Sequence, residues 1–250
     1  MSLKGVTAIV TGGGRGLGQA FACGLAESGA NVVVADIGDT TDTVGRIEAA
    51  GGRALGLRVD ITDQEAVGEM ANRTVSAFGS IDALVNNAAY FRAARSGTFE
   101  SIDPSELDRC LEVNVKGTWL ATRAVLPVMK KAGRGKIVNV SSASVWKGKS
   151  ATGPHYLTSK AATIGFTRAL ARELGQYGIT VNTLVPDAIP ETGGLDDPRG
   201  ADARRQVDPR CIQRVQTAQD MVGTLLYLCA GGSDFVTGQS LHVNGGSYFT

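Results

Sequence analysis

The chain has 250 residues, of which 43% are hydrophobic and 20% are charged, and its formal net charge is +1. This length suits one large α/β domain or two small ones, and the near-neutral charge gives no sign of a nucleic-acid or anionic-membrane surface. The expected partner is therefore a small molecule or another copy of the chain. The sequence has no stretch of 18 apolar residues, and we expect neither a signal peptide nor a membrane partner.

The cysteines argue against a metal site. The chain has 4 cysteines, far apart, with no CxxC motif and no Cys/His cluster. Metal sites need such clusters, so the pattern argues against a zinc site and for ordinary buried thiols. We therefore expect a reduced, cytoplasmic protein without a bound metal.

The first predicted strand leads directly into a glycine-rich turn. Residues 6–10 are a continuous apolar stretch, and Gly12, Gly16 and Gly18 follow in the spacing GxxxGxG rather than GxGxxG. A predicted helix then ends near Ser28. Glycines let a backbone approach a pyrophosphate, whose charge the helix N-terminus stabilises. A flexible loop would explain the turn alone, but its place between strand and helix favours a dinucleotide site.

Two further predicted strands end in an aspartate. The strand over residues 31–35 ends at Asp36, where a carboxylate would accept hydrogen bonds from an adenosine ribose. A turn or helix-cap aspartate is the alternative interpretation. The strand over residues 54–59 ends at Asp60, and a helix follows it. This alternation of strands and helices predicts a doubly wound parallel sheet.

Asparagines stand out in the middle of the chain. Asn86 and Asn87 follow a buried strand over residues 83–85, where paired amides suit a tight turn. Asn114 lies inside an amphipathic helix predicted over residues 104–131. Asparagine is unfavourable inside a helix, so we expect Asn114 to have a specific role.

A serine, a tyrosine and a lysine follow the next strand. The strand over residues 136–140 delivers Ser142 at its carboxyl end, and Tyr156 and Lys160 share one face of a predicted helix. A lysine within roughly 4–6 Å lowers the pKa of a phenol, which could then act as acid or base. A packed tyrosine beside a solvated lysine is the alternative. Ligands bind at the carboxyl ends of parallel strands. The segments expected to converge at this edge are the glycine turn, Asp36, Asn86, Ser142 and the helix of Tyr156.

Taken in order, these motifs make the chain resemble the short-chain dehydrogenase/reductase family over essentially its whole length. The matching motifs are TGxxxGxG at residues 11–18, Asp60, NNA at residues 86–88, Asn114, Ser142 and YxxxK from Tyr156 to Lys160. The resemblance implies a single Rossmann domain over residues 1–250, with a seven-stranded parallel sheet and a nicotinamide dinucleotide cofactor. The cofactor-binding residues that it implies are Gly12, Arg15, Gly16, Leu17, Gly18, Asp36, Asp60, Ile61, Asn87, Tyr156, Lys160, Pro186 and Ile189.

The resemblance also implies a catalytic tetrad. Tyr156 would be the general acid and base, and Ser142 would hydrogen-bond the carbonyl or alcohol oxygen. Lys160 would lower the pKa of Tyr156 and hold the nicotinamide ribose. Asn114 would place a water that connects Lys160 to solvent.

One segment departs from the family pattern. After the strand over residues 180–185, Pro186 is followed by Asp187 instead of the usual glycine, and Thr192 lies one residue later than the family's threonine. The segment at about residues 190–214 is rich in Gly, Asp, Arg and Pro, and it corresponds to the family's substrate lid.

The substrate pocket is expected to be aromatic. Its expected contacts are Ser142, Trp146, Tyr156 and Tyr90, with Phe91 and His155 nearby. Because aromatic walls favour apolar burial, we expect an apolar, cyclic or aromatic secondary alcohol rather than a charged sugar or phosphate. Local packing would explain the aromatic residues equally well.

The last predicted strand, over residues 240–243, leads into Asn244, where the family has an aspartate. In the family this strand and the long central helices form the faces of a homotetramer. The small residues Ala161, Ala162 and Gly165 would permit close helix approach, although a monomeric core explains them too.

The favoured function is that of an NAD-dependent short-chain alcohol dehydrogenase acting on a secondary alcohol or ketone. A phenolate can take the alcohol proton as the hydride leaves. NAD is expected over NADP because Asp36 would repel the NADP phosphate more strongly than Arg15 would attract it. The alternatives are an NADPH-dependent carbonyl or 3-oxoacyl reductase, and a catalytically silent dinucleotide-binding protein, which the intact serine, tyrosine and lysine disfavour.

Overall fold

Seven parallel strands form the centre of the molecule, in a computed structural model that describes residues 1–91, 93–190 and 210–250. Their order across the sheet is β3-β2-β1-β4-β5-β6-β7. The strands are β1 (Thr7–Thr11), β2 (Asn31–Asp36), β3 (Arg53–Arg58), β4 (Ala83–Asn86), β5 (Gly135–Val140), β6 (Ile179–Pro186) and β7 (Ser240–Val243). Every neighbouring pair is parallel. The predicted doubly wound seven-stranded sheet is confirmed.

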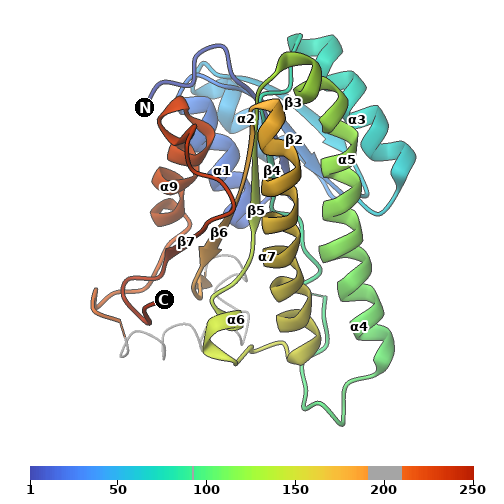
Figure 1. Ribbon diagram of the computed structural model, residues 1–250, viewed down its shortest axis with the longest axis vertical. Coiled ribbons are helices and arrows are strands. Elements are labelled where there is room, and N and C mark those ends of the chain that lie inside the picture. Colours follow the sequence, from blue (N-terminus) through green and yellow to red (C-terminus); the bar gives the residue numbers. More distant parts are fainter. Residues whose placement is uncertain (92, 191–209) are drawn as a thin grey trace.

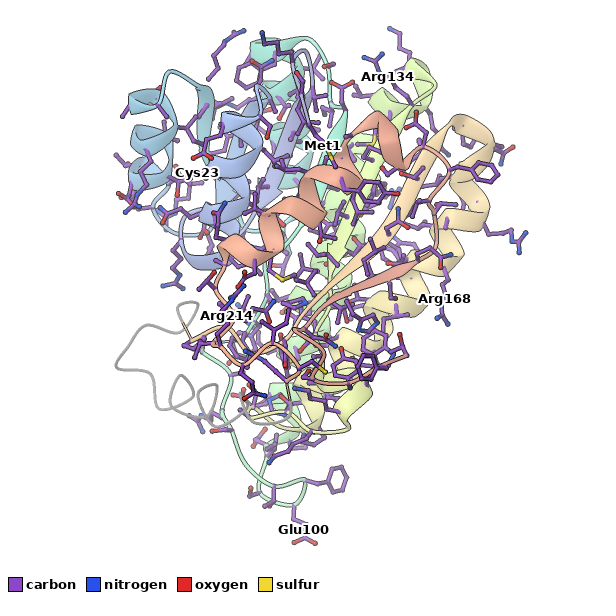
Figure 2. All side chains as sticks on the ribbon, turned by 90° about the vertical axis from the view of Figure 1, so that its left-hand side faces the viewer. Met1, Cys23, Glu100, Arg134, Arg168 and Arg214 are labelled. Carbon is purple, nitrogen blue, oxygen red and sulfur yellow. The ribbon has the colours of Figure 1, made fainter. Side chains whose placement is uncertain are left out.

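Helices cover both faces of this sheet. They are α1 (Gly16–Glu27), α2 (Thr41–Ala49), α3 (Gln64–Phe78), α4 (Pro104–Leu111), α5 (Thr118–Ala132), α6 (Ser144–Lys147), α7 (Pro154–Leu174) and α9 (Gln219–Cys229). Figure 1 shows α1 and α9 on one side and α3, α5 and α7 on the other. Figure 2 is turned toward the α1 and α9 side, with Cys23 of α1 labelled. No helix in the described ranges is long and apolar enough to cross a membrane.

Each face of the sheet has its own hydrophobic core. Val32 and Val34 of β2 belong to the core on the α1 and α9 side, whereas Val33 and Ala35 belong to the opposite core. Successive side chains of a strand point to opposite faces. A strand covered on both faces therefore needs the continuous apolar sequence found here.

The long helix predicted over residues 104–131 is interrupted. α4 ends at Leu111, a π-helical segment over Glu112–Gly117 follows, and α5 begins at Thr118. Asn114 lies in the π segment, and Thr118 Oγ1 donates a hydrogen bond to the Asn114 carbonyl at 2.9 Å. π-helical turns often occur at functional sites because they redirect side chains and backbone groups.

Asn86 is the last residue of β4, at the carboxyl edge of the sheet as predicted, but its side chain is buried in the core and does not line the cavity. Its Nδ2 donates to Thr122 Oγ1 at 3.0 Å and to Asn139 Oδ1 at 2.8 Å, and Asn139 in turn donates to Thr167 Oγ1 at 2.9 Å. These buried bonds join β4 and β5 to α5 and α7. Because successive residues alternate in direction, the neighbouring Asn87 faces the glycine turn instead.

All the cysteines are free thiols. Cys110 and Cys229 are buried, and burial raises their pKa to about 11 and about 12, so both stay protonated near neutral pH. Cys211 is exposed, which differs from the expectation of buried thiols throughout.

Candidate active site

A cavity of about 550 Å³ lies where the strands end, beside α6 and the start of α7 at the lower end of Figure 1. Every residue expected to bind the cofactor lines this cavity, as do Ser142, Tyr90 and Phe91. His155 is buried and does not line it. Thr192 and most of the expected lid lie outside the described residues.

The glycine-rich turn forms one end of the cavity. Gly12 and Gly16 have positive φ angles of 63° and 57°, which side chains rarely adopt. A Cβ added at Gly12 would meet the Ala88 Cα at 2.8 Å. α1 begins at Gly16, and no side-chain hydrogen bond caps its N-terminus. The turn therefore fits a pyrophosphate, which needs close backbone approach and free helix amides.

Asp36 holds this turn from the tip of β2. Its Oδ2 accepts a hydrogen bond from the Gly14 backbone N–H at 2.9 Å, and its Oδ1 accepts one from Gly38 at 2.8 Å. The carboxylate is half-buried and lines the cavity, as does the exposed Arg15. Its position at the end of β2 is the one that suits a ribose.

Asn87 and Asp60 are fixed at the same edge. Asn87 Nδ2 donates to the carbonyls of Thr11 and Gly12, both at 3.0 Å. Asp60 Oδ1 accepts hydrogen bonds from the Thr62 N–H at 2.9 Å and from its hydroxyl at 2.7 Å. Both residues therefore brace the loops that enclose the cavity.

Ser142, Tyr156 and Lys160 lie together at the other end of the cavity. Ser142 Oγ accepts hydrogen bonds from the Ser144 N–H at 3.2 Å and from the Ser144 hydroxyl at 2.9 Å. Lys160 Nζ lies 5.8 Å from the centroid of the Tyr156 ring and donates to the Val140 carbonyl at 2.8 Å. The structure therefore brings together the serine, tyrosine and lysine that the sequence predicted.

The acidity of Tyr156 differs from the prediction. Burial raises the pKa of Tyr156, the Cys110 thiol adds to the rise, and a hydrogen bond with Ser142 lowers it in part. Lys160, whose Nζ donates to the Val140 carbonyl, is not among the groups that shift this pKa. Burial also lowers the pKa of Lys160 to about 8. In this arrangement Tyr156 is a neutral phenol, and Ser142 is the group that favours its ionisation.

The lowered pKa of Lys160 leads to a prediction about stability. Between about pH 8 and 10.5 the unfolded chain holds the Lys160 proton and the folded chain does not, so rising pH favours folding through this residue. We expect the free energy of unfolding of the native protein, minus that of Lys160→Met, to increase by about 1.4 kcal/mol per pH unit in this window. Urea unfolding across the pH range measures it. A pH-independent difference would contradict the buried position of Lys160.

Asn114, the fourth residue of the predicted tetrad, does not line the cavity. Its Oδ1 accepts a hydrogen bond from the Tyr90 N–H at 2.6 Å, and its Nδ2 donates to Ser159 Oγ at 2.9 Å. Ser159 Oγ donates to the Tyr156 carbonyl at 2.7 Å. Asn114 therefore joins the Tyr90 loop to the helix that carries Tyr156.

Trp146 does not line the cavity, and its predicted contact with substrate stays a prediction. Its ring packs edge-on against His242, with centroids 4.2 Å apart, and lies 6.5 Å from the Tyr248 ring. The short helix α6 presents Trp146 to β7 and the C-terminal segment. Tyr90 and Phe91 do line the cavity, and the Phe91 ring centroid is 4.9 Å from that of Tyr156.

An ion pair at the substrate end was missed by sequence reasoning. Lys147 Nζ lies 2.7 Å from Asp187 Oδ1 and 2.8 Å from Oδ2, and both residues line the cavity. Burial raises the pKa of Asp187, but the hydrogen bond and charge of Lys147, with hydrogen bonds from Ser247 and the Ala188 backbone, outweigh it, so that the pKa is lowered overall. The signal in the sequence was the aspartate in place of the family's glycine.

Comparisons with known proteins agree with this geometry. A family model described as enoyl-(acyl carrier protein) reductase matches residues 12–248. The chain is 39% identical to the (2S)-[(R)-hydroxy(phenyl)methyl]succinyl-CoA dehydrogenase subunit BbsD of Thauera aromatica, covering 98% of both chains. It is 33% identical to the 3-oxoacyl-[acyl-carrier-protein] reductase FabG of Staphylococcus epidermidis, covering 97% of this chain and 98% of the relative. A solved structure from Beutenbergia cavernae, an NAD(P) dependent gluconate 5-dehydrogenase candidate with bound NADP at low occupancy, is 33% identical with a TM-score of 0.86, covering 98% of both chains.

Proposed function

The chain belongs to the short-chain dehydrogenase/reductase family of oxidoreductases, and we propose that it transfers a hydride between NAD and a secondary alcohol or ketone. One observation supports this proposal above the others. Ser142, Tyr156 and Lys160 lie at one end of a cavity whose other end is a glycine turn that fits a pyrophosphate. A dinucleotide held at the turn would extend toward these three side chains.

The protein's part in this proposed reaction is proton transfer and positioning. A bound nicotinamide dinucleotide supplies the hydride chemistry. Ser142 Oγ hydrogen-bonds the substrate oxygen, and Tyr156 takes the alcohol proton in oxidation or donates its own in reduction. Lys160 holds the nicotinamide ribose. Asn114 keeps a water path from Lys160 to solvent.

We propose an apolar, cyclic or aromatic secondary alcohol as substrate. Tyr90 and Phe91 support this proposal because they line the cavity beside Tyr156. The name of the Thauera relative supports the aromatic alcohol, since its hydroxy(phenyl)methyl group has an alcohol carbon that carries a phenyl ring, while its succinyl-CoA part is charged. Burial of aromatic surface against such walls favours binding by roughly 25 cal/mol per Å².

An NADPH-dependent carbonyl or 3-oxoacyl reductase is the second candidate. Arg58 favours it, because it lies opposite Asp36 in the sheet register and donates to the Ile37 carbonyl at 3.2 Å. Together with Arg15 it places two cations near the end of β2, where the NADP phosphate would bind. The relative that is a 3-oxoacyl reductase and the solved structure with NADP support the same alternative.

A homotetramer is part of the proposal. The ring of Trp119, which is 54% exposed on α5, stacks on Phe166 of α7 with centroids 5.3 Å apart. An exposed tryptophan that stacks on a partly buried phenylalanine of a second long helix is a feature of many protein interfaces. Light scattering of the native protein tests the tetramer, and a monomer at all concentrations would exclude it.

A panel of alcohols and ketones tests the function. Each compound is mixed with the protein and with NAD, NADH, NADP or NADPH, and the near-ultraviolet absorbance of the reduced nicotinamide is followed. We expect turnover of aromatic secondary alcohols with NAD. Activity confined to NADPH and 3-oxoacyl compounds would favour the second candidate, and no turnover with any pair would exclude both.

A further inference from the structure

Asp187 joins three segments at the substrate end of the cavity. Its carboxylate contacts Lys147 of α6 at 2.7 Å and Arg210 at 3.2 Å. Its backbone N–H donates to Gln216 Oε1 at 3.2 Å, and Gln216 Nε2 donates to the Val243 carbonyl at 2.7 Å. One residue therefore connects the end of β6 to α6, to the chain at residue 210 and to the end of β7.

These contacts are buried. The side chains of Asp187 and Arg210 are 3% and 1% exposed, and that of Lys147 is 22% exposed. Arg210 also donates to the Ala188 carbonyl at 3.2 Å and to the Arg214 carbonyl at 3.1 Å. Removing one partner of a buried ion pair leaves the other charge uncompensated. The group is therefore held in one geometry, unlike an exposed ion pair, which is screened by solvent.

The position of Ser142 depends on α6. Ser142 Oγ accepts two hydrogen bonds from Ser144, the first residue of α6, and Lys147 is the last residue of this short helix. The Ala143 N–H donates to the Pro186 carbonyl at 2.9 Å. α6 is thus attached to β6 at both ends: by a backbone bond beside Ser142, and by the Asp187 carboxylate at Lys147.

We propose that Asp187 is a positioning residue that fixes α6 and, through Ser144, the hydroxyl of Ser142. The inference rests on the proposed function, in which Ser142 holds the substrate oxygen. A glycine at this position has no side chain with which to hold Lys147. Asp187 therefore makes the orientation of Ser142 in this chain depend on a charge that the family pattern lacks.

Kinetics of four variants test the proposal. Asp187→Asn removes the charge at nearly constant volume, and Lys147→Met removes its partner while Arg210 still pairs with Asp187, so that folding is retained. We expect either change to lower kcat by about 10- to 100-fold, the effect of a small misplacement of a reacting group, with the Kd for NAD unchanged.

The double variant should be no slower than the slower single variant, because the residues act as a unit. The matched control is Asp234→Asn, which breaks the Lys136–Asp234 pair, 2.6 Å long and away from the cavity, and should keep native kcat.

Fluorescence gives a second readout that needs no substrate. The chain has 2 tryptophans, so Trp119→Phe leaves Trp146 of α6 as the only one. In this background we expect Asp187→Asn to increase quenching of Trp146 by acrylamide, and Asp234→Asn to leave it unchanged. Native kcat in both Asp187→Asn and Lys147→Met, or native quenching in Asp187→Asn, would overturn the inference. If the native protein turns over no alcohol or ketone, the proposed function fails, and the quenching alone decides whether Asp187 fixes α6.

Discussion

Tyr156→Phe is expected to lose about 10²–10⁴-fold in kcat, the usual contribution of general acid and base catalysis, while it keeps its affinity for NAD. The phenyl ring stays in its buried place beside Phe91, so the cavity wall is preserved. Only the hydroxyl that is proposed to exchange a proton with the substrate is lost. Steady-state turnover of the best alcohol, together with the Kd for NAD from protein fluorescence, measures both parts of the prediction.

The control for this change is Tyr177→Phe. Tyr177 is 37% exposed, and its ring lies under Lys130 Nζ at 4.4 Å from the centroid, away from the cavity. Tyr177→Phe removes one phenol that takes no part in the proposed reaction, so native turnover is expected. A well-folded Tyr156→Phe protein with near-native kcat would remove Tyr156 from the mechanism.

Asp36→Ala is expected to reduce the preference for NAD over NADP by up to several hundredfold. At about 4 Å and an effective dielectric near 20, two like unit charges repel by roughly 4 kcal/mol, before relaxation and salt lower the effect. The exposed Arg15 recovers only part of this repulsion. The ratio of kcat/KM for the two cofactors, in the native protein and in the variant, is the measurement.

Asp36 also holds the glycine turn, and the experiment must separate this role from cofactor selection. Because its carboxylate accepts hydrogen bonds from Gly14 and Gly38, alanine also loosens the glycine turn and weakens both cofactors. Asp36→Asn keeps an acceptor and removes the charge, so it should change the cofactor ratio with less loss of affinity. A native preference for NADP, or an unchanged ratio in both variants, would show that Asp36 does not select NAD.

Most of the sheet could be predicted from the sequence because its strands are buried on both faces and read as continuous apolar stretches. Helices α2 and α6 could not be predicted, because α2 has few buried residues and α6 is a single turn. The π-helical segment at Asn114 was not predicted either, because the amphipathic sequence pattern continues from α4 through this segment into α5. Only the unfavourable asparagine indicated that the helix was irregular there.

Site residues could be predicted where a sequence motif fixes the backbone. They were predicted less well where the direction of a side chain decides whether it reaches the cavity. The glycine turn and the pair Tyr156 and Lys160 have such motifs, and the structure places them at one cavity. Asn86 and Trp146 have the right position in the chain but face the core and β7. A one-residue change in register reverses the direction of a side chain on a strand, and the sequence does not show which side of a one-turn helix faces a ligand.

Transfer of deuterium from the substrate to the cofactor tests the central claim most directly. A secondary alcohol that carries deuterium on its carbinol carbon is incubated with the protein and NAD, and the cofactor is analysed by mass spectrometry. We expect the native protein to produce deuterated NADH, and Tyr156→Phe to produce about 10²–10⁴-fold less in the same time. Reduced cofactor without deuterium, or equal production by the two proteins, would contradict hydride transfer assisted by Tyr156.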